Sequence, residues 1–90
     1  MYTTHARVRM QQRGIPPLIV EWLIEYGATA FDHAGGRIRF FDKESRTQLR
    51  RAKGEIALRR FHELLDCYAV VAEDDTVITV GHKYRRLRTP

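Results

Sequence analysis

Cysteine, proline and long apolar runs are scarce in this chain of 90 residues, which contains 1 cysteine and 3 prolines. A single cysteine excludes an internal disulfide bond and a cysteine-rich zinc site. No apolar run approaches the ~20 residues of a membrane-spanning helix. The first residues, Met-Tyr-Thr-Thr-His, lack the cationic start and apolar core of a secretory signal. We therefore expect a cytoplasmic protein without a membrane partner.

Acidic residues are in the minority, since 11 Asp and Glu stand against 16 Lys and Arg, for a net charge of +5. This balance favours polyanionic partners such as nucleic acid, an acidic protein or an anionic surface. The alternative interpretation is a basic but otherwise ordinary protein. No internal repeat, low-complexity tract or linker is evident, so residues 1–90 are predicted to form a single domain with one small core.

The last third of the chain predicts an antiparallel hairpin. Two β-rich runs, Cys67–Ala72 and Thr76–Gly81, flank the acidic turn Glu73-Asp74-Asp75. The first run is apolar at consecutive positions, which predicts a central strand that is covered on both faces. The second run alternates more and leads into a basic tail that begins at His82.

Helices are predicted at the start of the chain. Thr3 or Thr4 can cap a helix over His5–Arg13, and Gly14 fits the left-handed position that ends a helix. Two prolines then suit the first turn of a second helix, which runs to Tyr26. This second helix is so apolar that we expect it to be buried against a sheet.

Two further strands are predicted over Ala28–His33 and Arg37–Asp42, around a glycine-rich turn. Side chains alternate along a strand, so Ile38 and Phe40 share one face, and Arg37, Arg39 and Phe41 share the other. We expect one face to pack on the helices and the opposite face to present the arginines.

The middle of the chain, Lys43 to Leu65, is predicted to be helical with a break at Gly54. Its apolar residues recur at helical spacing and form the stripe Leu49, Ala52, Ile56, Phe61 and Leu64. The order helix, helix, strand, strand, helix, strand, strand predicts an α+β domain. In it, two N-terminal helices and a middle helical segment pack on a four-stranded antiparallel sheet.

Two basic clusters each contain a histidine. The first is the row His5, Arg9, Arg13, which recurs every four residues and therefore lies on one side of a helix. The second lies in the tail and consists of His82, Lys83, Tyr84, Arg85, Arg86 and Arg88. Imidazole transfers protons near neutral pH and guanidinium binds phosphate oxygens bidentately, which suits phosphoryl chemistry on RNA. The alternative is a solvated helix face and a frayed basic terminus.

The remaining candidates indicate no further chemistry. His33 lies near a turn, and His62 either lines a cleft or is structural. The histidines have no close metal-ligand spacing, so we predict neither a metal site nor a cofactor. Cys67 lies inside an apolar run, and we expect a buried thiol there rather than a nucleophile.

The opening of the chain resembles a bacterial family of uncharacterised small domains. Members of that family begin with His-Ala, then Arg-Met, then Arg-Gly-Ile, followed by a second helix and a glycine. The resemblance covers the first third of this chain and is carried by His5, Ala6, Arg9, Met10, Arg13, Gly14, Ile15 and Gly27.

The end of the chain, Val80-Gly81-His82-Lys83-Tyr84-Arg85-Arg86, is similar to the last strand of RelE/ParE-type toxins. Lys83 stands where those toxins usually have arginine. This resemblance implies a RelE-like fold and the toxin of a toxin–antitoxin pair, which cuts messenger RNA, often at the ribosome. It also implies an acidic antitoxin as a partner. The chain departs from common RelE-like toxins because both N-terminal helices precede all the strands and a helical insert follows.

Together these patterns suggest a metal-independent endoribonuclease, in which the ribose 2′-hydroxyl attacks the adjacent phosphate. We expect His5 and His82 to transfer protons and Tyr84 to stack on a base or donate a proton. The cations that would stabilise the developing phosphorane charge are Arg9, Arg13, Lys83 and Arg86. The predicted contacts to the nucleic acid are Arg13, Arg37, Arg39, Lys83, Arg85, Arg86 and Arg88.

Two alternatives remain open. One is a non-catalytic RNA- or DNA-binding module in which the same cations only contact phosphates. The other is an interaction domain whose basic face meets an acidic protein. The nuclease hypothesis requires that folding bring the N-terminal helical row and the end of the last strand to one pocket.

Overall fold

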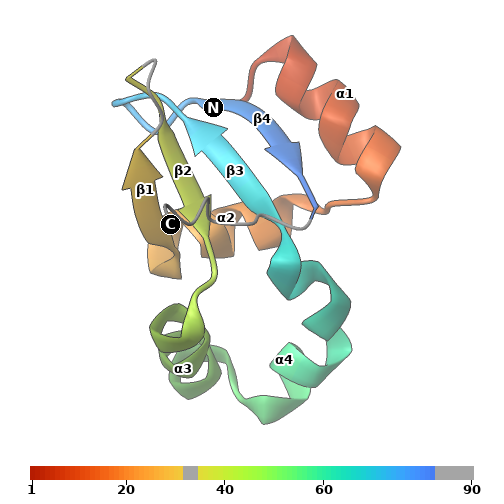
Figure 1. Ribbon diagram of the computed structural model, residues 1–90. Helices are drawn as coiled ribbons and strands as arrows, with labels where there is room; N and C mark the ends of the chain where they lie inside the picture. Colours follow the sequence, from red (N-terminus) through yellow and green to blue (C-terminus); the bar gives the residue numbers. More distant parts are fainter. Residues whose placement is uncertain (32–34, 83–90) are drawn as a thin grey trace, which may run out of the picture.

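The computed structural model describes residues 1–31 and 35–82 (Figure 1). The elements follow in the order α1 (Thr4–Arg13), α2 (Pro17–Tyr26), β1 (Ala28–Phe31), β2 (Arg37–Phe40), α3 (Lys43–Lys53), α4 (Glu55–Arg60), the 3-10 helix η1 (His62–Asp66), β3 (Tyr68–Val71) and β4 (Val77–Gly81). The strands form one antiparallel sheet in the order β1-β2-β3-β4. The predicted α+β class is therefore confirmed. No helix in this described part of the chain is long and apolar enough to cross a bilayer.

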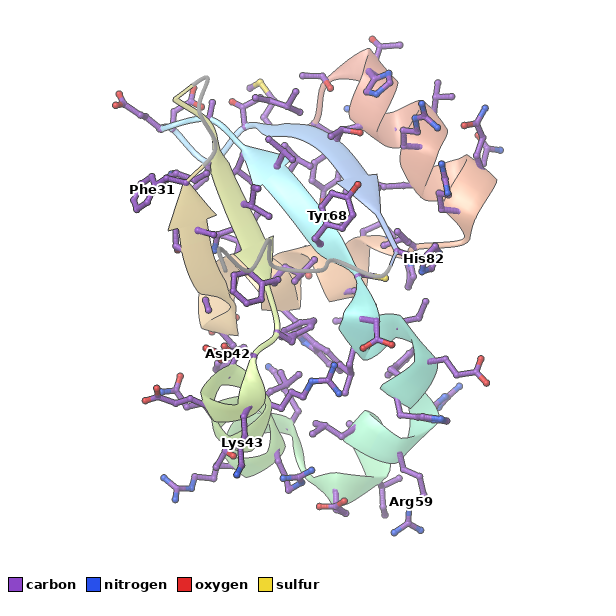
Figure 2. All side chains as sticks on the ribbon, viewed as in Figure 1. Phe31, Asp42, Lys43, Arg59, Tyr68 and His82 are labelled. Atoms are coloured by element: carbon purple, nitrogen blue, oxygen red, sulfur yellow. The ribbon has the colours of Figure 1, made fainter. Side chains whose placement is uncertain are left out.

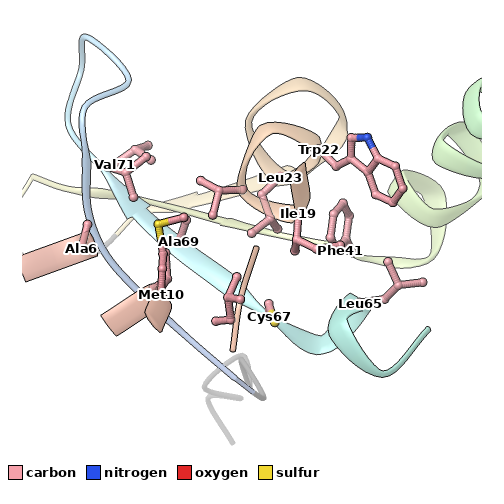
Figure 3. Close-up of a cluster of buried hydrophobic side chains, with 14 of the residues drawn as sticks. Ala6, Met10, Ile19, Trp22, Leu23, Phe41, Leu65, Cys67, Ala69 and Val71 are labelled. Carbon is pink, nitrogen blue, oxygen red and sulfur yellow. The ribbon is translucent and has the colours of Figure 1, made fainter. Parts of the chain in front are cut away.

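Helix α2 covers one face of the sheet, whereas α1 lies beside the edge strand β4, and α3 and α4 extend beyond one end of the sheet (Figure 1). The core forms where α2 meets the covered face, with Ile19 and Leu23 fully buried against Ala69 and Val71 (Figure 3). We call the opposite face the open face, because no described helix covers it.

Helix α1 begins and ends as its sequence predicts. Thr3 is the N-cap, and its hydroxyl oxygen accepts a hydrogen bond from the Ala6 N–H at 3.0 Å. Gly14 has φ 65°, the left-handed conformation that glycine adopts without steric cost. The residues before α1 pair with the start of β4, since the Thr3 N–H donates to the Val77 carbonyl and the Val77 N–H donates to the Met1 carbonyl. Helix α1 is therefore held alongside β4 from its first turn.

The prediction that the Cys67–Ala72 run is covered on both faces is wrong. Burial alternates along β3: Ala69 and Val71 are fully buried under α2, but Tyr68 and Val70 on the open face are only half-buried. Both sides of this strand are apolar, so its sequence pattern resembles that of a strand between two helical layers. The described residues supply only one such layer.

The prediction that Arg37 and Arg39 lie on the face opposite the helices is also wrong. Arg39 points toward α2, where Nε donates to the Leu23 carbonyl at 3.2 Å and Nη2 donates to the Ile24 carbonyl at 2.7 Å. The Leu23 carbonyl also accepts from the Gly27 N–H at 2.9 Å, whereas the Ile24 carbonyl lies in the last turn of α2, where carbonyls lack intrahelical donors and attract cations. Burial lowers the pKa of Arg39 from its ordinary value, as expected for a cation withdrawn from water.

Arg37 shares this covered face and fastens the β3–β4 turn. One of its Nη atoms donates to the carbonyls of Ala72 at 2.8 Å and Glu73 at 3.0 Å, and it forms an ion pair with Asp75 at 2.8 Å. Both arginines of β2 therefore hold the fold together and lie away from the open face.

The predicted break at Gly54 is confirmed, because Gly54 has φ 92° and separates α3 from α4. The predicted apolar stripe is wrong at Ala52, which is exposed, and at Ile56, which is 82% exposed. The break redirects the chain, so helical spacing does not continue across it and Leu58 is buried instead. Strand β2 also ends at Phe40, two residues before its predicted end, and Asp42 caps α3 by accepting from the Ser45 N–H at 2.8 Å.

The role of Arg39 predicts a large loss of stability in the Arg39→Ala variant. Removing the guanidinium leaves two half-buried carbonyls of α2 without these donors, and hydrogen bonds to charged groups contribute about 1.5–3 kcal/mol each. We expect the free energy of urea-induced unfolding to fall by at least about 2 kcal/mol. The control is Arg51→Ala, which removes an exposed arginine of α3. Equal stability of the two variants would contradict the capping role.

Candidate functional site

His82 joins the C-terminal end of α1 to the sheet. Its Nε2 lies 2.6 Å from the carbonyl oxygen of Arg13, and its Nδ1 lies 3.4 Å from Sγ of Cys67. A carbonyl oxygen only accepts hydrogen bonds, so Nε2 must carry the proton. Nδ1 of the neutral ring then accepts from the thiol. Both ring nitrogens are thus engaged within the protein.

The Cys67 thiol is suited to this donor role. The residue is completely buried, as expected from its place in an apolar run. Burial, together with the negative charge of Asp66, raises the pKa of the thiol to about 11. The sulfur therefore keeps its proton at neutral pH and is not a nucleophile.

His82, the one described member of the second basic cluster, meets the first cluster only at its Arg13 end. The Arg13 carbonyl is bonded to His82, so the end of α1 and the end of β4 lie together, as the nuclease hypothesis requires. His5 lies in the first turn of α1, separated from Arg13 by ~12 Å along the helix axis. That turn is beside the start of β4, where the Thr3 hydroxyl donates to the Ile78 carbonyl at 3.0 Å. His5 and His82 therefore lie at opposite ends of β4 and do not flank one phosphate.

The basic row of α1 borders the open face of the sheet. Ala6 and Met10 point into the core, and the flank of α1 toward α2 is marked by a hollow that Arg7 and Gln11 help to line. Helical spacing places His5, Arg9 and Arg13 on the other flank. His5 and Arg13 are exposed and Arg9 is partly exposed, and the structure pairs none of their side chains with another described residue. This flank is available to a ligand.

The described residues of the open face carry no charge, and the face is centred on Tyr68. Strand pairing aligns Phe40, Tyr68 and Gly81 across the sheet, with Ile38, Val70 and Thr79 in the next row. The tyrosine ring lies directly over Gly81, because a Cβ at that glycine would come within 2.6–2.7 Å of the phenol atoms. Figure 2 shows Tyr68 in front of the sheet, on the side away from α2. Glycine at this position therefore leaves room for the ring to lie flat.

Sequence reasoning missed Tyr68 because the whole run was interpreted as core. The useful signal was the tyrosine itself, since Val70 and Val71 lie on opposite sides of β3 and residue size does not tell the two sides apart. Tyrosine has a polar end that is rarely left inside an unpaired core, so its place in an otherwise apolar strand indicates partial exposure.

Several predicted site residues cannot be placed. Lys83, Tyr84, Arg85, Arg86 and Arg88 lie outside the described residues, as does His33. His82, the last described residue, immediately precedes the basic tail in the sequence. Arg37 and Arg39 are not part of the open face, for the reasons given above. In the ranges that are described, no three His, Cys, Asp or Glu side chains are placed to share a metal ion.

No known protein-family model, curated protein or solved structure matches this chain. The likeness to the small bacterial domains and to RelE/ParE-type toxins stays a prediction. What the geometry provides is an aromatic, uncharged face with two arginines along its border, Arg9 and Arg13, that have no partner among the described residues. Such a face suits a ligand with flat rings and phosphate groups.

The raised pKa of Cys67 predicts a loss of stability at alkaline pH. The unfolded chain releases the thiol proton near the ordinary pKa of 9.0, but the folded protein releases it only near 11. The contribution of this group is thus fully present below pH 9.0 and is lost as the pH rises to about 11. Urea unfolding should show this loss for the native chain and a smaller one for Cys67→Ala. Parallel pH profiles for the two proteins would contradict the assignment.

Proposed function

We propose that this chain binds single-stranded RNA across its open face and cleaves it without a metal ion, as the toxin of a toxin–antitoxin pair. One observation carries the proposal. The uncharged face around Tyr68 is bordered by Arg9 and Arg13, and Arg13 is fastened to His82, from which the basic tail continues. Aromatic surface and available cations thus lie side by side, which is the usual composition of a surface that binds single strands.

The binding step follows from these side chains. A base stacks on the ring of Tyr68, which is sequence-tolerant because every base has a flat aromatic face. The guanidinium groups of Arg9 and Arg13 each present paired N–H donors to phosphate oxygens. A single strand suits this arrangement better than a duplex, because its bases are free to turn toward the protein.

The cleavage step uses the same arginines. The ribose 2′-hydroxyl attacks the neighbouring phosphorus atom and gives its proton to solvent water, because His5 is remote and both ring nitrogens of His82 are engaged. The bond to the 5′-oxygen breaks, and Arg9 and Arg13 stabilise the extra negative charge of the phosphorane. His82 can protonate the leaving oxygen only after it has taken up a second proton at Nδ1, which displaces the Cys67 thiol, and has released the Arg13 carbonyl. His5 lies too far from His82 to complete the same step.

Two alternatives have specific support. Both ring nitrogens of His82 are occupied and His5 is remote, which favours a non-catalytic RNA- or DNA-binding module. The available arginines of α1 would equally meet carboxylates, which favours an interaction domain that binds an acidic protein. The toxin proposal includes an acidic antitoxin that covers this flank, and the ribosome as a place of action.

Tyr68 provides the test of binding. Loss of base stacking costs about 1–3 kcal/mol per base, so Tyr68→Ala should weaken the binding of a short single-stranded RNA by roughly 5- to 150-fold. Tyr68→Phe keeps the ring and is the matched control, with an affinity within about twofold of the native chain. The measurement is fluorescence anisotropy of a labelled oligonucleotide. If Tyr68→Ala binds as tightly as Tyr68→Phe, RNA does not use the open face.

Arg9 and Arg13 provide the test of cleavage. In the presence of EDTA, the double variant Arg9→Gln/Arg13→Gln should cut RNA at least about 100-fold more slowly, as expected when charge-stabilising donors are removed. Arg51→Gln is the control, since this arginine is exposed on α3. Undiminished cleavage by the double variant would remove α1 from the site. Binding by the native chain with no cleavage at all would identify the non-catalytic module.

A further inference from the structure

A second candidate binding site lies outside the open face, where α3, α4 and η1 line an open cavity of about 270 Å³. Figure 1 shows α3 and α4 extending together beyond the end of the sheet, with η1 leading back into β3. The cavity is lined by Arg46, Arg50, Glu55, Leu58, Arg59, His62 and Leu65. Three guanidinium groups thus share it with one carboxylate, over the buried side chains of Leu58 and Leu65.

Two of the three arginines are held in place by bonds that use only part of each guanidinium. One Nη atom of Arg46 donates to the Leu65 carbonyl at 3.1 Å and to the Asp66 carboxylate at 2.9 Å. Nε of Arg50 pairs with the Glu55 carboxylate at 2.7 Å. A guanidinium has five N–H donors, so both groups keep donors for a ligand. Their orientation is already restricted, which lowers the entropy lost when a ligand binds.

The remaining polar groups of the cavity are less constrained. Nδ1 of His62 lies 3.2 Å from the Arg59 carbonyl, which can only accept, so Nδ1 carries a proton. The structure gives neither Nε2 of His62 nor the Arg59 guanidinium a partner among the described residues. Arg59 projects from α4 at the rim, toward solvent (Figure 2). The cavity therefore has a fixed interior and one less constrained cation at its entrance.

We propose that this cavity binds a phosphate group of the RNA strand that lies on the open face, an inference that rests on the proposed function. The three arginines carry one more charge than the two carboxylates that pair with them, Glu55 and Asp66, and a tetrahedral phosphate accepts from several arginines at once. Leu65, which lines the cavity, lies three residues before Tyr68, so their Cα atoms are separated by at most ~11 Å. An RNA strand that stacks on Tyr68 would therefore extend across α3 and α4.

The test compares two double variants that remove the same charge from the same two helices. Arg50→Gln/Arg59→Gln removes cavity arginines, and Arg51→Gln/Arg60→Gln removes exposed arginines that do not line the cavity. Each is assayed with single-stranded RNAs of about 5 and about 15 nucleotides, which bracket a short and a long binding site.

We expect the cavity variant, Arg50→Gln/Arg59→Gln, to bind the long RNA about 10-fold more weakly than the native chain. The slope of log affinity against log salt should fall by about 0.7 for each phosphate that the protein no longer neutralises. Its affinity for the short RNA should stay within about twofold of the native chain, and the control variant should stay within about twofold for both RNAs. Equal losses of affinity in the two double variants would overturn the proposal, since they would reflect net charge alone.

A direct measurement separates this inference from the proposed function. Inorganic phosphate and uridine monophosphate are titrated into isotope-labelled native protein, and the side-chain NMR signals of Arg50 and Arg59 should shift while those of Arg60 do not. If the Arg50 and Arg59 signals shift but the protein binds no RNA, the cavity is a phosphate site and the proposed function is refuted. No shift with either probe would refute the cavity site, whatever the Tyr68 variants show.

Two further outcomes would also overturn the inference. Tight binding of uridine monophosphate, with equal effects of the cavity variant on the short and the long RNA, would identify a free nucleotide as the ligand. Stronger binding of a polyglutamate peptide than of the long RNA would identify an acidic protein as the partner.

Discussion

The structure depends on one constraint: among the described residues, the helices cover only one face of the sheet, although the central strand β3 is apolar on both sides. The covered face becomes the core, with Ala69 and Val71 completely buried. The opposite face keeps Tyr68 and Val70 only half-buried. An apolar surface that a small domain leaves exposed is a common location for a binding site. The candidate RNA-binding face is thus a consequence of how few layers the described chain provides.

The contact between His82 and the Arg13 carbonyl places the basic flank of α1 against that face. Helix α1 is fastened at its start by pairing of Thr3 with Val77 and at its end by His82, so its arginines have a defined position relative to Tyr68. The same bond, together with the buried Cys67 thiol, occupies both nitrogens of the imidazole. His82 is therefore first a residue that positions α1, and any proton transfer at this ring must compete with that role.

The excess of positive charge has several uses that composition does not separate. Arg39 caps α2, Arg37 fastens a turn, and Arg46 holds η1. Other arginines, including Arg9, Arg13 and Arg59, are left without partners among the described residues. Only this second group is fully available to an anionic ligand. A net charge of +5 thus overstates how many cations can face an anionic ligand. The arginines without partners among the described residues lie on α1 and α4, and their positions indicate where such a ligand would bind.

Local signals in the sequence determined the elements of this protein. Thr3, Gly14 and Gly54 mark helix ends through their own backbone and hydrogen-bonding preferences, which need no distant partner, and the α+β class follows from the order of the elements. The tertiary structure alone decided which face of each strand is covered. Alternation along β2 divides its side chains into two sets, but a period of two is the same whichever set faces the helix. The placement of Arg39 depends on the carbonyls of α2, and that of Tyr68 on the single helical layer among the described residues. The separation of His5 from His82 depends on α1 running alongside β4. None of these follows from the sequence, because each depends on contacts between residues far apart in the chain.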